Sequence, residues 1–263
     1  MQRRLQCSLI RFRNHCIRWA VLIALALFSH SLVLAQDDLV AVPNRPTVST
    51  TAQPVQPGVL ETEWGVDAAG SHQDINGLFK FGVSTNFELR FANNPFTAGS
   101  GTHGVGDTAL GFKYRFLQDS GHQPSMAFIY MAKLPTAGSV LGSGETDHAF
   151  AWLVSKDLGK QHFDFNAIAN LLGRPQGGFD RAYLYALAWS APLHGKWGAT
   201  AELSGVTSPS PSTPGNAQFI ASAIYTLRPR LVLDIGMMGR VTGDIPDAMF
   251  VAGFTYSIAR FHR

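Results

Sequence analysis

Charged residues are scarce in this chain of 263 residues. Asp, Glu, Lys and Arg make up 15% of it, against roughly 25% in an ordinary soluble domain. Hydrophobic residues still reach 46%, which excludes intrinsic disorder. No run of roughly 18 or more apolar residues occurs, which excludes a bundle of membrane-spanning helices. The 26 Gly and 14 Pro exclude a coiled coil, so the sequence favours Gly-rich β-structure.

The formal net charge of +3 does not indicate a nucleic-acid-binding surface. Residues 1–35 contain five Arg and no acidic residue. The remaining 16 Lys and Arg face 18 Asp and Glu, which leaves a net charge of −2 after residue 35. We therefore expect no nucleic-acid partner.

The first 35 residues have the pattern of a signal peptide. A basic stretch over residues 3–18 precedes an apolar run of about ten residues, Trp19–Phe28, and small residues follow at Val33 and Ala35. The pattern predicts cleavage after Ala35. Both cysteines, Cys7 and Cys16, lie in this leader, so the exported chain has no disulfide framework and no cysteine metal site.

Residues 36–57 are polar and Pro-rich, and we interpret them as a flexible N-terminal extension. From residue 58 to 263, apolar and polar residues alternate with period two. The first such strand places Trp64 and Val66 on one face and Glu61 and Glu63 on the other.

About twelve strands of roughly ten residues follow one another, the length that crosses a bilayer when tilted. The first, third, fifth, seventh, ninth and eleventh connections are expected to be long and the others short. The sequence predicts an all-β fold, a transmembrane antiparallel up-and-down β-barrel of about 12 strands with both termini on the periplasmic side. Aromatic residues are then expected at the periplasmic strand ends: Phe87, Phe116, Phe163, Trp197, Tyr225 and Phe261. A soluble, secreted β-sandwich or barrel would also alternate, but the low charge and the strand length count against it.

If the apolar face meets lipid, the polar face lines the lumen. Phe112 is then expected to face lipid, and its neighbour Gly111 is expected to tolerate Ser. Three arrangements remain open: a salt-bridge network that fills the lumen, a solute path, and a narrow pore partly plugged by Gln36–Pro57. The candidate lumen-lining residues are Glu61, Glu63, Lys80, Glu88, Arg90, Asp107, Lys113, Arg115, Lys133, Asp164, Glu202 and Asp234.

Catalytic motifs are weak. Gly99–Gly104 matches G-x-G-x-x-G, but no βαβ unit surrounds it, and no G-x-S-x-G, H-E-x-x-H or P-loop occurs. The histidines show no ligand spacing, so we expect no metal, no cofactor and no catalytic residue. An outer-membrane hydrolase that recruits His103, His148 or Ser143 from loops stays a third alternative.

The chain resembles the outer-membrane transporter family named for the MetA pathway of phenol degradation. The resemblance implies a barrel in the outer membrane and an association with uptake or turnover of aromatic compounds. Its most specific stretch is Gly106–Phe116. The matching stretches are Arg45–Thr47, Gly58–Gly65, Glu88–Arg90, Gly106–Phe116, Leu134–Thr136 and Ser155–Asp157.

We therefore expect an outer-membrane channel that passes small solutes, including aromatic or apolar ones, in a Gram-negative-type envelope. The expected partners are outer-membrane lipid, the barrel-assembly machinery and a small-molecule solute. The main alternative is a non-conducting structural barrel, or one whose loops bind partners. The openness of the lumen separates these two hypotheses.

Overall fold

The computed structural model describes residues 39–262 except 71, 100, 139–140 and 211, and these residues belong to one compact unit, Leu39–Arg263. The predicted signal peptide lies outside the described residues. The described part of the chain is all-β, and none of it forms a helix long and apolar enough to cross a membrane. The strands are β1 (Val59–Ala69), β2 (His72–Gly82), β3 (Phe87–Gly99), β4 (Thr102–Gly104), β5 (Thr108–Leu117), β6 (Ser125–Leu134), β7 (Asp147–Leu158), β8 (Gln161–Gly173), β9 (Phe179–Pro192), β10 (Trp197–Val206), β11 (Asn216–Arg228), β12 (Leu231–Thr242) and β13 (Ala248–Arg260).

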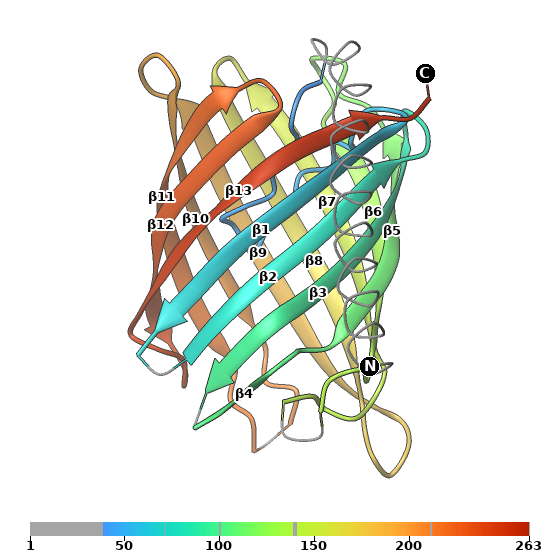
Figure 1. Cartoon of the computed structure of the whole chain (residues 1–263), viewed down its shortest axis with the longest axis vertical. Coiled ribbons are helices and arrows are strands. Elements are labelled where there is room, and N and C mark those ends of the chain that lie inside the picture. Colours follow the sequence, from blue (N-terminus) through green and yellow to red (C-terminus); the bar gives the residue numbers. More distant parts are fainter. Residues whose placement is uncertain (1–38, 71, 100, 139–140, 211, 263) are drawn as a thin grey trace, which may run out of the picture. The chain divides into compact units, whose positions relative to one another are not determined.

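Twelve long strands close into an antiparallel barrel. Each pairs with its neighbours in chain order, and the ring closes because β1 pairs with β13 on one side and with β2 on the other. The three-residue β4 pairs with the end of β3 and is not one of the twelve strands of the ring. Figure 1 shows β13, β1, β2 and β3 side by side, with the start of β1 and the end of β13 at the same end of the barrel. The predicted twelve-stranded up-and-down barrel is confirmed.

The prediction of a long first connection was wrong. The first is only a two-residue turn, since β1 continues to Ala69 and β2 begins at His72. Gly70 supplies the positive φ of 59° that such a turn favours. Polar residues from Asp67 onward continue the ladder because backbone hydrogen bonds do not require apolar side chains. The third connection is shorter than predicted because β3 continues to Gly99, but it contains β4 and remains longer than the turn between β2 and β3.

Side chains alternate across the barrel wall as predicted. In β5, Leu110 and Tyr114 are each 47% exposed, whereas Lys113 and Arg115 are 0% and 5% exposed and face inward. Gly111 also faces inward, but the expectation that it tolerates Ser was wrong. A Cβ there would lie 1.9 Å from the backbone oxygen of Tyr130.

In β9, which is apolar on both faces in sequence, side-chain size distinguishes the outward face from the inward face. Tyr183, Tyr185 and Leu187 are exposed, and Ala186 and Ala188 are buried. Large residues therefore cover the outside, and small ones leave room in the lumen.

The predicted aromatic residues gather near the end of the barrel where β1 begins. Trp197 opens β10 and packs on Tyr225 of β11, with ring centroids 4.8 Å apart. Phe116 lies near the end of β5, and its ring centroid is 5.0 Å from that of Trp152. Phe261 follows β13 directly.

Candidate functional site

Residues 39–57, called here the lumen segment, run inside the barrel. Leu39, Ala52 and Val55 are at most 1% exposed, although the segment contains no helix or strand. Figure 1 shows this stretch in blue within the ring of strands. Of the arrangements that the sequence left open, the position of residues 39–57 fits the barrel partly plugged by Gln36–Pro57, so residues 39–57 do not form a separate extension.

Carboxylates of the wall satisfy the backbone N–H groups of the lumen segment. Such a segment has no strand partner, so each buried N–H needs another acceptor. Glu202 accepts from two successive amides, through Oε1 from Val48 at 3.1 Å and through Oε2 from Ser49 at 2.7 Å. The other amide-to-carboxylate bonds are Val42 to Glu61 at 2.9 Å, Asn44 to Glu63 at 2.9 Å and Val55 to Glu88 at 2.8 Å.

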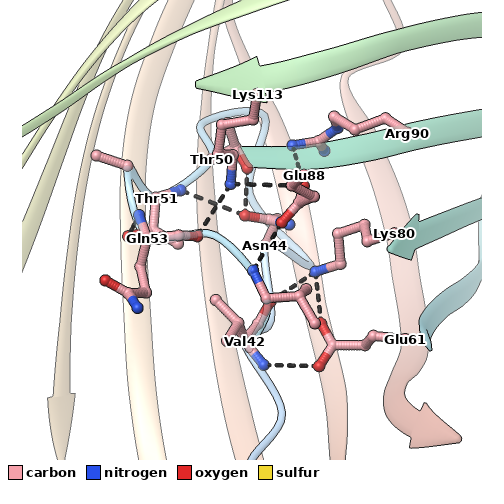
Figure 2. A network of polar contacts seen from close by, with 12 residues as sticks. Val42, Asn44, Thr50, Thr51, Gln53, Glu61, Lys80, Glu88, Arg90 and Lys113 are labelled. Carbon is pink, nitrogen blue, oxygen red and sulfur yellow. Dashed lines mark hydrogen bonds and ion pairs between the residues drawn. The ribbon is translucent and has the colours of Figure 1, made fainter. Parts of the chain in front are cut away.

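Two lysines bind the segment from the wall. Lys80 Nζ donates to the oxygen of Val42 at 2.6 Å and forms ion pairs of 2.6 Å with both Glu61 and Glu63. Lys113 Nζ donates to the oxygen of Gln53 at 3.1 Å. Both lysines are completely buried. Figure 2 shows Lys80 reaching the segment from β2 and Lys113 from β5, with Arg90 on the strand between them.

Glu88 connects the second lysine to Arg90. The Glu88 carboxylate lies 3.9 Å from Lys113 Nζ and 3.3 Å from Arg90 Nη1 (Figure 2). The three acids Glu61, Glu63 and Glu88 thus match the three bases Lys80, Arg90 and Lys113 in number.

Arg45 extends from the segment into the wall. Its guanidinium lies 3.6 Å from both Asp67 and Asp234 and donates to the oxygen of Ala252 at 3.3 Å. Gly65 and Gly253, paired across β1 and β13, make room for it. A Cβ at Gly65 would lie 1.9 Å from Arg45 Cζ. Sequence reasoning used Arg45 only for the family resemblance.

The middle of the segment is held by uncharged groups of β7 and β8. Asn166 accepts from Thr50 N at 2.8 Å and donates to Thr50 O at 3.0 Å, as a neighbouring strand would. Ser155 Oγ accepts from Ala52 N at 2.7 Å. Ser155 in turn donates to Asp164 at 2.5 Å. Sequence reasoning missed Asn166 and Ser155 because their residue types are ordinary for a polar barrel face.

Two of the predicted lumen residues lie away from this network. Asp107 and Lys133 are 3.2 Å apart beside the connection between β6 and β7, and Lys133 also lies 2.7 Å from Asp147. Burial raises the pKa of Asp107, but bonds from Ala137 N–H and Lys133 outweigh it and leave that pKa below its ordinary value. Of the other predicted residues, Arg115 binds Gln53 and the oxygen of Thr85.

Each of the three residues considered for catalysis contacts a residue outside that set. Ser143 Oγ accepts from Lys133, His148 Nδ1 lies 2.9 Å from the hydroxyl of Tyr130, and the His103 ring stacks on Phe96. Among the described residues, no group of three or more His, Cys, Asp or Glu is placed to hold a metal ion.

Cavities lie on both sides of the segment. The distal cavity, about 330 Å³, lies toward the barrel end where β1 finishes and has Val48 and Thr50 in its wall. The proximal cavity, about 300 Å³, lies on the other side and has Thr51 and Gln53 in its wall. The segment around residues 50–51 therefore separates the two.

The model of the family described as "Putative MetA-pathway of phenol degradation" matches residues 44–257, which is most of the chain. None of the curated proteins matches the sequence.

Solved structures share the fold. An outer-membrane channel from Pseudomonas putida F1 is 13% identical with a TM-score of 0.60, and the match covers 81% of this chain and 98% of that chain. The NanC porin is 9% identical with a TM-score of 0.56, and the match covers 75% of this chain and 99% of that chain. At such identities the likeness is one of fold.

Proposed function

Because this chain belongs to the family described as "Putative MetA-pathway of phenol degradation" and has the fold of outer-membrane porins and channels, we propose that it is an outer-membrane channel for small solutes. In this proposal the lumen segment is the gate. The family description supports aromatic compounds as solutes.

The outer face of the barrel supports a location in the lipid of the outer membrane. Exposed apolar side chains such as Leu89, Leu110, Ile235 and Phe250 lie on strands around the barrel. In water such a surface would be an aggregation site, whereas lipid covers it. The chain would reach this membrane through its signal peptide and the barrel-assembly machinery.

The observation that carries the proposal is the pair of cavities separated by residues around 50–51. A solute needs only this short part of the segment to move in order to pass from one cavity to the other. Leu39 and Val55, near the ends of the segment, pack with Val59 in one apolar cluster, and Ala52 packs in a second one. The part around residues 50–51 is held by hydrogen bonds, which water can replace.

A disulfide between the segment and the wall tests the gate. Residues 36–263 contain no cysteine, and Ala52 N lies 2.7 Å from Ser155 Oγ, so we choose the double variant A52C/S155C. In planar bilayers the oxidised variant should conduct less than the same molecules after reduction. Each single-cysteine variant should be indifferent to oxidation. Equal conductance of the bridged and reduced forms would contradict the gate.

A non-conducting structural barrel is the second candidate, favoured by the paired buried charges. It predicts no conductance and no solute flux from folded wild-type barrels, with or without residues 36–57. Folding would be verified by the shift in gel mobility between unheated and heated samples. Flux through the folded wild type would exclude this candidate.

A further inference from the structure

We propose that the distal cavity binds a small monoanionic carboxylate with an apolar body, held by Arg90. The inference rests on the proposed channel function only in that it names the solute class. The site itself is argued from the cavity and tested by binding.

The Arg90 guanidinium has N–H donors that a ligand could engage. A guanidinium carries five N–H donors, and among the described residues the Arg90 side chain makes one hydrogen bond, from Nη1 to Glu88 at 3.3 Å. The residue is 8% exposed, and it lies in the wall of the distal cavity. A buried guanidinium with unfilled donors is matched best by a carboxylate, which can accept two parallel bonds.

The charges around the cavity favour an anion with a single charge. Of the two arginines in its wall, Arg45 is paired with Asp67 and Asp234, so Arg90 supplies the one positive charge with N–H donors left for a ligand. The Glu63 carboxylate is already engaged by Lys80 at 2.6 Å and by the backbone N–H of Asn44 at 2.9 Å. A dianion such as a phosphate would exceed this charge.

The rest of the wall favours an apolar body on the ligand. Ile129 and Met131 of β6, Ile168 of β8 and Leu78 of β2 contribute aliphatic surface, and Ala149 leaves space. A volume of about 330 Å³ is at the lower end of the usual range for ligand sites, so the ligand must be small. An aromatic carboxylate such as benzoate has the required charge, shape and size.

Titration calorimetry of the full mature barrel in detergent tests the site with benzoate. Benzamide has the same shape without the charge, and acetate has the charge without the ring. We expect benzoate to bind at least ten-fold more tightly than either. Equal binding of benzamide would refute the role of Arg90, and equal binding of acetate would refute the apolar wall. No binding of benzoate to the folded barrel at millimolar concentration would overturn the whole proposal.

Variants locate the ligand. R90Q should weaken benzoate at least ten-fold, whereas R115Q should change it less than two-fold, because Arg115 lies in the wall of the proximal cavity. A149L fills the distal cavity without altering its charge and should abolish binding even if R90Q fails to fold. Equal effects of R90Q and R115Q, or unchanged binding to A149L, would overturn the assignment. Benzoate binding without solute flux would support the site and refute the channel. Solute flux without benzoate binding would support the channel and refute the site.

Discussion

Replacing Lys80 with Met tests whether the lumen segment and the wall form one energetic unit. Lys80 is 0% exposed, and its ammonium contacts the Val42 oxygen, Glu61 and Glu63, each at 2.6 Å. K80M leaves a carbonyl without its donor and two buried carboxylates without their counter-charge. Breaking a buried ion pair by removing one partner costs about 3–5 kcal/mol, so we expect a loss in that range.

The assay is urea unfolding of the barrel refolded in lipid vesicles, followed by tryptophan fluorescence. K133M is the control, since Lys133 forms its ion pairs at 27% side-chain exposure and its loss should cost about 1 kcal/mol or less. The triple variant E61Q/E63Q/K80M removes the uncompensated charge and should recover at least half of the loss. A K80M penalty no larger than that of K133M would refute the reasoning.

Three further predictions follow from the fold. F112R should cost roughly 2–4 kcal/mol in refolding into bilayers because it places a charge in lipid. The control A109S, on the inward face, should change stability by less than about 0.5 kcal/mol. Equal costs of the two variants would contradict the assigned faces. N-terminal sequencing of the exported protein should begin at residue 36, and retention of the apolar run would contradict cleavage after Ala35. G65A should cost about 1–3 kcal/mol in urea unfolding, since its Cβ would collide with Arg45, and a neutral result would show that Arg45 is not held there.

The barrel could be predicted because period two is a local property. In β5 the alternation alone places Lys113 inward and Tyr114 outward, and the structure confirms both. β9 could not be assigned from hydropathy because both of its faces are apolar. Its alternation of Tyr and Leu with Ala is a size pattern of the same period, which could have indicated the inward face.

The pairings within the site depended on one turn. The tight turn that follows Ala69 places Glu61 opposite Lys80 in the register of β1 and β2. Expecting a long first connection left that register open, so the lumen residues could be listed but not paired. Strand register is set by turn geometry. The positive φ of Gly70, which marks this turn, is a property of the backbone conformation and could not be read from the sequence.

The position of the lumen segment could not be read from local sequence for a different reason. A polar, Pro-rich stretch has the same composition whether it is free in water or held by a wall. Its backbone partners lie far away in sequence, from Glu61, 19 residues after Val42, to Glu202, 154 residues after Val48. Only the closed barrel brings these groups together.

The same contacts determine what the lumen charges can do. While the segment is in place, Glu61, Glu63, Glu88 and Glu202 accept its backbone N–H groups, and Lys80 and Lys113 donate to its carbonyl groups. These charges are therefore committed to binding the segment and are not free to select ions. If only the part around residues 50–51 moves, these charged groups keep their partners, and the groups returned to water are uncharged ones such as Asn166, whose hydrogen bonds water can replace. Any selectivity of the open channel would consequently come from groups that the segment does not engage, such as Arg90 in the wall of the distal cavity, so substituting Arg90 should alter selectivity and leave the segment in place.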